Sequence, residues 1–167
     1  MRKTGVVGAD HHLLWVGVEN WGRFAWGTHS QIGGILAALP ERCGAYVLTK
    51  VHTGLVGVEV NYHESRPELD FDSWEDADLV VVDAPLGDLC VLPIGGYGDV
   101  LQEIVPGPGV YNVCCSSRGR DEADEAEDAD PPVEFYRFDV WPAGPADADT
   151  VLKQTSAWSR EVLATFG

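Results

Sequence analysis

Short runs rich in apolar and β-branched residues recur along most of the chain, and glycine, proline, asparagine or aspartate separates them. In the segment 55–62, Val56, Val58 and Val60 alternate with smaller or polar residues, which is typical of a strand with one buried and one solvated face. Runs of this kind predict strands joined by short turns. They occupy residues 12–19, 23–26, 45–52, 55–62, 78–83, 89–92, 109–117 and 134–141.

The residues between neighbouring runs predict which strands pair. Gly54 can supply the positive φ that a two-residue hairpin turn needs, while Asn20 and Gly22 end the first run. Pro85 and Gly87 mark a further turn. We therefore expect antiparallel pairs between 12–19 and 23–26, between 45–52 and 55–62, between 78–83 and 89–92, and between 109–117 and 134–141.

Helical patterns are few. The segment 31–39 is the best candidate, but its glycine pair and Pro40 restrict it to a short helix or a loop. Residues 150–159 are ambiguous and can close the sheet as a last strand, with a final helical turn or two over 160–166. About eight strands with so little helix predict one all-β domain over residues 1–167, an antiparallel two-sheet β-sandwich of jelly-roll type with at most one or two short helices.

Tryptophans and cysteines refine the expected core. Trp15, Trp26 and Trp141 lie within apolar runs, which indicates packing rather than recognition. Cys114 and Cys115 are neighbours on a predicted strand and point to opposite faces, so one of them is expected to be exposed or covered by a loop. The four cysteines show no CxxC spacing, and reduced thiols in the cytoplasm are the simpler interpretation.

The balance of charge is strongly acidic: 27 Asp and Glu face 11 Lys and Arg, which gives a net charge of −16. More than half of the acids fall in the segments 64–78 and 121–134. A field of this sign repels nucleic acid and anionic membranes, and it favours a basic protein partner or multivalent cations. Solubility, or adaptation to salt, is the alternative explanation of the same charge.

The second acidic segment is expected to form the tip of the last hairpin, a loop over 119–133. Between residues 121 and 130 only alanine separates the acids, so this stretch offers no core face and must be solvated. The two prolines that follow stiffen the return and would hold the tip away from the sheet. Arg118 and Arg120 precede the acids and can either order the tip by pairing with them or recognise a carboxylate of a partner.

Sequence motifs of catalysis and of cofactor binding are absent. The chain has no G-x-S-x-G, no P-loop and no G-x-G-x-x-G that opens a helix, so we expect neither an enzyme nor a cofactor. The histidines show no zinc-type spacing: His11 and His12 would diverge on a strand, and His52 and His63 would lie at opposite ends of their hairpin. A site assembled from distant loops stays open.

The first acidic segment suggests a different chemistry. Asp clusters on the loops of a β-sandwich can bind Ca²⁺. The candidate ligands are Asp70, Asp72, Asp76 and Asp78. The spacing is not that of an EF-hand, because Glu75 stands where that loop requires glycine. The simpler interpretation is a polar loop in which Asp72 or Ser73 caps a short helix that starts near Trp74.

The second half of the chain has a layout that resembles a known family. It begins with Pro106-Gly-Pro-Gly-Val-Tyr111 and a strand, continues through Arg118-Gly-Arg-Asp121 and the acidic loop, and ends with Glu134-Phe-Tyr136 and Trp141-Pro-Ala143. This layout resembles small β-proteins of high-GC bacteria, and over about forty residues it is similar to the competence protein J family. The resemblance implies inhibition of a partner nuclease and supplies no catalytic residues.

Charge and resemblance together predict a bacterial, cytoplasmic, non-enzymatic protein that masks a basic partner such as a nuclease or a toxin, as an inhibitor or immunity protein does. Direct contact with nucleic acid or a membrane is not expected. The expected contacts are Asp121, Glu122, Asp124, Glu125, Glu127 and Asp128, with Trp74 and Asp76 as a second contact. The alternative is a Ca²⁺-dependent lipid- or carbohydrate-binding module that uses the four aspartates named above.

Overall fold

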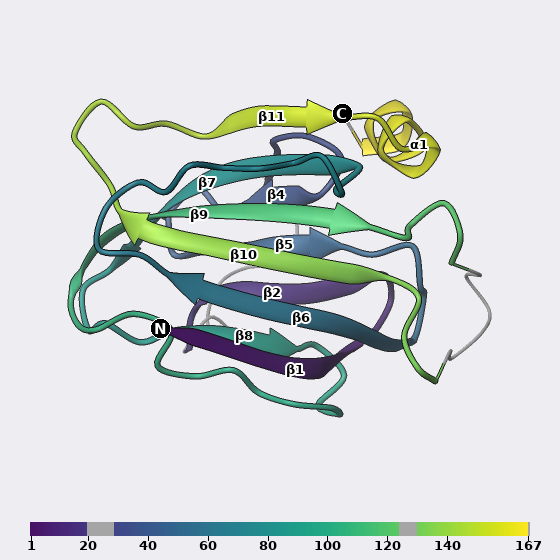
Figure 1. Ribbon diagram of the computed structural model, residues 1–167, viewed down its shortest axis with the longest axis horizontal. Coiled ribbons are helices and arrows are strands. Elements are labelled where there is room, and N and C mark those ends of the chain that lie inside the picture. The colour runs from purple at the N-terminus through teal and green to yellow at the C-terminus, as the bar shows by residue number, and fades with distance from the viewer. Residues whose placement is uncertain (20–28, 124–129, 167) are drawn as a thin grey trace.

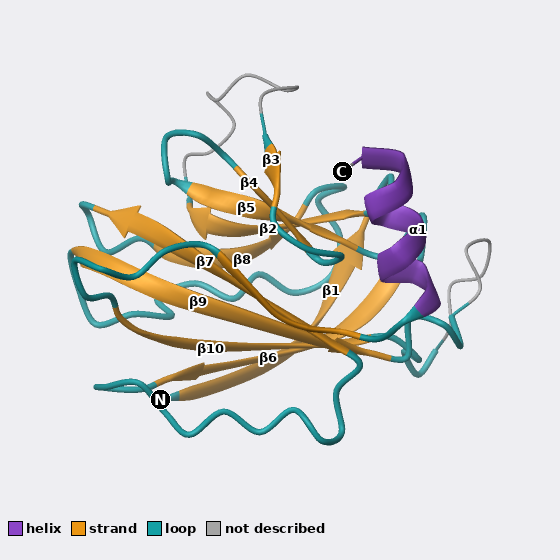
Figure 2. Cartoon of the chain, turned by 90° about the horizontal axis from the view of Figure 1, so that it is seen from above, coloured by secondary structure: helices purple, strands orange, loops and turns teal. Residues whose placement is uncertain are grey.

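The structure is a computed structural model of the chain, and it describes residues 1–19, 29–123 and 130–166. Two β-sheets lie face to face as two layers (Figure 2), which confirms the all-β, two-sheet class expected from the short apolar runs. Eleven strands and one helix are found among the described residues, more strands than those runs predicted. No helix in these three ranges is long and apolar enough to cross a membrane.

The large sheet has six strands in the order β1-β6-β10-β9-β7-β11 (Figure 1). Its strands are β1 (Arg2–Ala9), β6 (Gly54–Tyr62), β7 (Asp76–Ala84), β9 (Gly109–Arg118), β10 (Phe135–Pro142) and β11 (Thr150–Gln154). The small sheet has five strands in the order β3-β4-β5-β2-β8. Its strands are β2 (Leu13–Val18), β3 (Ser30–Gln31), β4 (Leu36–Ala38), β5 (Gly44–Leu48) and β8 (Leu89–Pro93). The helix α1 (Ala157–Phe166) follows β11 and lies at one end of the two layers (Figure 2).

The pairing of strands is antiparallel, as expected, except between β6 and β10. These two strands run parallel, with Phe135 opposite Gly57 and Val140 opposite Tyr62. A parallel pair needs a long connection between its strands, and here β7, β8 and β9 lie between them in the sequence. The predicted hairpin of β9 and β10 is confirmed, with β9 ending beside the start of β10. The expected last strand and final helical turns are confirmed as β11 and α1, although α1 already begins at Ala157, within the run expected as strand.

The predicted hairpin between residues 45–52 and 55–62 is wrong, because β5 and β6 belong to different sheets. After β5 the chain crosses from one layer to the other instead of turning at Gly54. The main-chain N–H groups of Lys50 and Val51 donate to the carboxylate of Glu134 at 2.8 and 3.0 Å. This buried carboxylate satisfies the donors of the crossing segment, so the chain needs no neighbouring strand there.

Two further expectations are corrected in the same way. β7 and β8 do not pair, because the chain crosses between the layers after β7 and β8 joins β2. The segment 31–39 is neither a helix nor a loop: β3 and β4 form a short hairpin. The N–H groups of Ile35 and Leu36 donate to the buried carboxylate of Asp78 at 2.9 and 3.0 Å, which leaves them no role in a helix. Residues 23–26, the expected partner of the first run, lie outside the described residues.

The main core fills the space between the sheets. Trp15, Tyr136 and Phe138 are almost completely buried there, as is Cys115. The packing role predicted for Trp15 is confirmed, while Trp26 lies outside the described residues.

A second, smaller cluster contains Cys114 and Trp141, together with Leu79 and Val81 of β7. Leu69 and Phe71, from the segment that precedes β7, pack over it. Trp141 is therefore buried as predicted, and both cysteines are buried because a loop covers Cys114.

Candidate functional site

The second acidic segment, residues 121–134, begins just after β9 ends, and we call it the acidic segment. In Figure 1 the described parts of the connection between β9 and β10 extend beyond the end of the large sheet, on the same side as α1. Two of the predicted contact residues, Asp121 and Glu122, are exposed there. The other four acids of the predicted tip lie outside the described residues: Asp124, Glu125, Glu127 and Asp128.

A buried ion pair fixes the base of this segment. Arg120 is fully buried, and its Nη1 lies 3.2 Å from Oδ2 of Asp76, the first residue of β7. The same guanidinium donates to Ser159 Oγ of α1 at 2.9 Å and to the carbonyls of Gly34 and Leu48 at 2.6 and 3.1 Å. One side chain therefore joins the acidic segment to both sheets and to the helix. Arg120 was expected either to pair with the acids of the tip or to recognise a carboxylate of a partner, and instead it pairs with the interior.

Asp76 is part of this interior network and has no exposed surface. Its Oδ1 accepts the main-chain N–H groups of Thr155 and Ser156 at 2.8 and 3.0 Å, and its Oδ2 accepts the hydroxyl of Ser156 at 2.5 Å. Burial raises the pKa of Asp76, but these hydrogen bonds and the charge of Arg120 outweigh that effect and hold the pKa below its usual value. Its predicted role as an exposed contact is therefore corrected to a structural one.

Asp121 caps α1 from outside the helix. Its two carboxylate oxygens accept the main-chain N–H groups of Ala157 and Trp158 at 2.8 and 2.9 Å. A carboxylate in this position satisfies free donors of the first turn and interacts favourably with the helix dipole. The first acid of the predicted tip is thus engaged within the protein, while Glu122 is the first exposed acid after it.

Trp74 lies partly buried on the outer face of the large sheet and does not start a helix. The guanidinium groups of Arg118 and Arg137 lie 5.0 and 4.8 Å from the centre of its ring. Arg118 also lies 5.1 Å from the ring centre of Phe135. Both arginines are within the distance at which a cation is attracted to an aromatic face. Arg118 therefore packs on aromatic rings. Pairing with the acids of the tip had been one of the two expectations for this residue.

The four aspartates of the Ca²⁺ alternative do not form one site. Asp76 and Asp78 point into the core side of the large sheet, whereas Asp70 and Asp72 belong to the segment that covers its other face. Burial raises the pKa of Asp78 to about 6, against the lowering effect of its two main-chain hydrogen bonds. No group of three or more His, Cys, Asp or Glu within residues 1–19, 29–123 and 130–166 is arranged to hold a metal ion.

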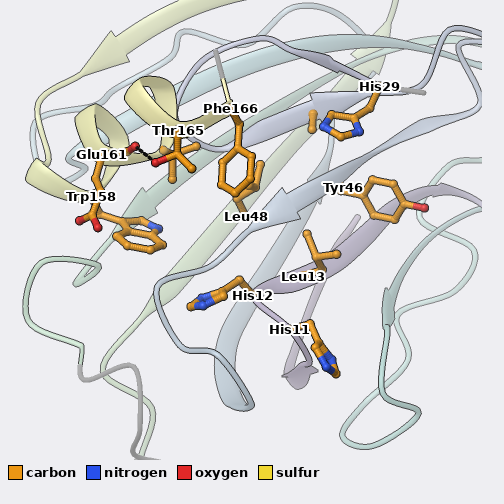
Figure 3. Close-up of a pocket in the computed structure, with 12 residues that line it drawn as sticks. His11, His12, Leu13, His29, Tyr46, Leu48, Trp158, Glu161, Thr165 and Phe166 are labelled. Carbon is orange, nitrogen blue, oxygen red and sulfur yellow. Dashed lines mark hydrogen bonds between the residues drawn. The ribbon is translucent and has the colours of Figure 1, made fainter. Parts of the chain in front are cut away.

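A pocket of about 440 Å³ lies between α1 and the small sheet, and we call it the α1 pocket (Figure 3). Its volume is within the range of ligand-binding pockets, roughly 300–1,000 Å³. Its described lining residues are His11, His12, Leu13, His29, Ala37, Tyr46, Leu48, Trp158, Glu161, Val162, Thr165 and Phe166. Tyr46, Leu48 and Val162 are buried and form its floor, whereas Glu161 and Phe166 are exposed at its mouth.

Sequence reasoning missed this pocket because it treated the histidines as separate. His11 and His12 lie in the two-residue turn between β1 and β2, not on a strand, and both have positive φ, 50° and 65°. The ring of His52 lies 5.1 Å from that of His11 and 4.8 Å from that of His12. The signal available was the position of Asp10-His-His between two apolar runs, residues 6–9 and 13–18, which is typical of a turn between two strands. His63 lies elsewhere, 2.9 Å from Asp139.

No protein-family model matches the chain, and no curated protein matches it in sequence. Two solved structures share the two-sheet fold. ComJ from Bacillus subtilis, an inhibitor of the DNA-degrading activity of NucA, has a TM-score of 0.57 and 15% identity, over 84% of this chain and 96% of that chain. A protein described as Crocagin biosynthetic gene J has a TM-score of 0.53 and 17% identity, over 86% of this chain and 99% of that chain.

These comparisons confirm that the layout of the second half of the chain belongs to a fold similar to that of ComJ. The identities are low, so they concern the arrangement of strands. The chain is thus a two-sheet β-protein of the same fold as a nuclease inhibitor, with an acidic segment and a lined pocket at one end.

Proposed function

We propose that this chain is a non-enzymatic, acidic binding protein that inhibits a nuclease, or a similar enzyme with a basic substrate groove, by covering that groove. The observation that carries the proposal is the fold shared with ComJ over 84% of this chain, since ComJ inhibits the DNA-degrading activity of NucA. The net charge of −16 supports it. A nuclease must present positive charge to bind phosphates, and an acidic surface can compete for that charge.

The acidic segment is the surface we assign to this role. Its base is held by Arg120 and Asp76, both fully buried, so the acids that follow start from a fixed point. A fixed starting point lowers the conformational entropy lost when the partner binds. We assign the contact to five acids: Glu122, Asp124, Glu125, Glu127 and Asp128. We leave out Trp74, because two arginines lie over its ring and would repel a basic partner.

The cytoplasm is the compartment that fits the cysteines. All four are free and buried. Burial raises the pKa of the Cys43 thiol to about 11 and that of the Cys90 thiol to about 12, which keeps both protonated and unreactive. Buried thiols without disulfides are typical of proteins from a reducing environment.

The test compares two variants that lose the same charge. The tip-neutral variant changes Glu122, Asp124, Glu125, Glu127 and Asp128 to the corresponding amides. The scattered variant changes five acids elsewhere: Glu41, Glu64, Glu68, Asp72 and Asp83. Proteins retained by the wild type from host lysate at low salt are identified, and the DNA-degrading activity of each is measured with and without the chain.

We expect the wild type and the scattered variant to inhibit a retained nuclease, and the tip-neutral variant to lose most of that inhibition. Equal inhibition by the wild type and the tip-neutral variant would reject the assignment to the acidic segment. Retention of no nuclease, or of one whose activity does not change, would reject the proposed function itself.

A further inference from the structure

The α1 pocket combines aromatic walls with groups that accept hydrogen bonds. Figure 3 shows Trp158 and Phe166 of α1 on one side of it, and Leu13, His12 and Tyr46 on the other. Aromatic faces of this kind bind apolar groups and also attract cations.

The hydrogen bonds of the imidazoles indicate which ring nitrogens remain available. Each Nδ1 lies within hydrogen-bond distance of an oxygen that can accept its proton, and in the neutral ring this arrangement leaves Nε2 as an acceptor. For the lining imidazoles the contacts are His11 Nδ1 to Asp10 Oδ1 at 3.1 Å and His12 Nδ1 to the Thr49 carbonyl at 3.1 Å. His52 packs against both rings without being one of the described lining residues, and its Nδ1 lies 2.9 Å from Thr53 Oγ1. Thr53 in turn donates its hydroxyl to Asp10 at 3.1 Å, which leaves its oxygen to accept from His52.

The charge of the lining favours a cationic ligand that donates hydrogen bonds. Glu161 is exposed at the mouth, and its carboxylate is the acidic group of the described lining. Neither Lys nor Arg occurs among the lining residues that the structure describes. A ligand that donates hydrogen bonds, carries positive charge and has a flat or apolar surface fits this set.

Trp158 shows that a cation can be held beside the pocket. The Nζ of Lys50 lies 4.2 Å from the centre of the indole ring, within the distance of a cation–π contact. Lys50 is not one of the described lining residues, but it contacts a ring that lines the pocket. Its charge would compete with a second cation that approaches the same ring.

We infer that the α1 pocket receives an arginine side chain of the basic partner. Arginine fits better than lysine because its planar guanidinium stacks on aromatic rings and carries five donors for acceptors such as imidazole Nε2 and carboxylate. Aromatic residues and arginine are also the side chains that most often dominate the energy of interfaces. This inference rests on the proposed function and adds the group that the partner inserts.

The position of the pocket fits the same interface. Asp121, which opens the acidic segment, accepts the main-chain N–H of Trp158, which lines the pocket. The two features therefore meet at the first turn of α1. A partner that places basic groups against the acidic segment would have the pocket within reach.

The test uses the full chain and defined probes. The probe is acetyl-Gly-Arg-Gly-amide, and its control contains citrulline, which has the shape of arginine without its charge. Binding is followed by the indole N–H signal of Trp158 in two-dimensional NMR, assigned with a Trp158→Phe variant. The indole of Trp15 is the internal reference, because it is buried and donates to the Val18 carbonyl.

We expect the arginine probe to shift the Trp158 signal with a millimolar dissociation constant, and the citrulline probe to leave it unchanged. Glu161→Gln should weaken binding about two- to fivefold, the size of an exposed charge pair. Lys50→Gln should strengthen it by a similar factor, because it removes the competing cation. Glu68→Gln, the matched control away from the pocket, should change nothing.

Several results would overturn the inference. One is a citrulline probe that shifts the Trp158 signal as much as the arginine probe does. Another is a Trp158 signal that does not move at a high concentration of the arginine probe. A third is neutral acetyl-tryptophanamide that binds more tightly than the arginine probe. Self-association that shifts the Trp158 signal would instead assign the pocket to a second copy of the chain.

The inference and the proposed function fail separately. If the wild type binds no arginine probe and the Glu161→Gln variant still inhibits the nuclease fully, only the assignment of the pocket is rejected. Arginine binding without any inhibition rejects only the proposed function.

Discussion

The main-chain N–H of Trp158 donates to Oδ1 of Asp121 at 2.9 Å, although the two residues are 37 positions apart in the sequence. Because α1 has no acidic residue of its own in its first turn, the carboxylate that caps it comes from the end of the β9–β10 hairpin. The acidic segment and the α1 pocket are therefore coupled through one side chain.

Replacing Asp121 with alanine removes this cap. We expect the free energy of unfolding to fall by about 0.5–2 kcal/mol, the usual cost of losing a capping side chain. Hydrogen exchange of the first amides of α1 should accelerate, because Ala157 and Trp158 lose their acceptor. Asp121→Asn keeps an acceptor oxygen and should show a smaller change. Unaltered exchange in the alanine variant would contradict the capping role.

The pair of Arg120 and Asp76 should be the most costly ion pair to break. Both side chains are buried, so Arg120→Met leaves a carboxylate without its counter-charge, and we expect a loss of about 3–5 kcal/mol in urea unfolding. The exposed pair of Arg2 and Glu59, at 2.8 Å, is the matched comparison, and Arg2→Met should cost about 0–1 kcal/mol. Similar costs for both variants would show that the buried pair has no special role.

The contact between Gly34 and α1 leaves no room for a side chain. A Cβ added to Gly34 would overlap the side chain of Ser159, which lies directly against it. We expect Gly34→Ala to destabilise the protein by about 1–3 kcal/mol, the usual cost of overpacking. Gly107 has no heavy atom within 4 Å of the same position, so Gly107→Ala is the control and should be nearly neutral. Thermal unfolding of both variants measures the difference.

The buried carboxylate of Asp78 should give the protein a recognisable pH dependence. Its folded pKa of about 6 lies above the ordinary value of 3.8, so between these pH values the folded protein holds a proton that the unfolded chain has lost. The contribution of Asp78 to stability therefore falls as pH rises through this window. Asp76, with a lowered pKa, acts in the opposite sense: it stabilises the fold above its ordinary value, and that stabilisation is lost as pH falls through its folded pKa.

An Asp78→Asn variant isolates the first effect, because it keeps the titration of Asp76. From pH 4 to pH 7 the stability of the variant relative to wild type should rise, by at most about 3 kcal/mol. The measurement is urea unfolding of both proteins at matched pH. A difference that stays constant with pH would mean that Asp78 titrates normally.

Association with a basic partner should depend on salt through the acidic segment. The association rate of the wild type should fall steeply as ionic strength rises, because long-range attraction is screened beyond about 8 Å at physiological salt. The tip-neutral variant should start from a lower rate and respond less. Stopped-flow mixing at several salt concentrations measures both, and parallel slopes for the two proteins would exclude steering by the segment.

The parts of this fold that sequence reasoning predicted are those with local causes. The β9–β10 hairpin follows from two apolar runs with a solvated stretch between them, and β11 with α1 follows from the pattern after residue 150. The failures have distant causes. The crossing after β5 depends on the carboxylate of Glu134, which is 84 positions from Lys50, and the β3–β4 hairpin depends on Asp78.

The candidate site shows the same division. The solvated acids were visible from composition, but the buried roles of Asp76 and Arg120 require knowledge of which strand ends meet. The α1 pocket brings a turn near the N-terminus together with the last helix. The spacing of residues along the chain does not predict that these two segments are in contact.

The turn of His11 and His12 has a consequence for what holds the pocket in place. Both residues adopt left-handed backbone angles that an Asn-Gly pair would adopt with less strain, so the imidazoles are held there against a local preference of about 1–2 kcal/mol per residue. An Asn-Gly replacement should therefore leave a more stable protein with a barer pocket mouth. We expect the replaced protein to keep its fold and to lose the imidazole acceptors of the pocket.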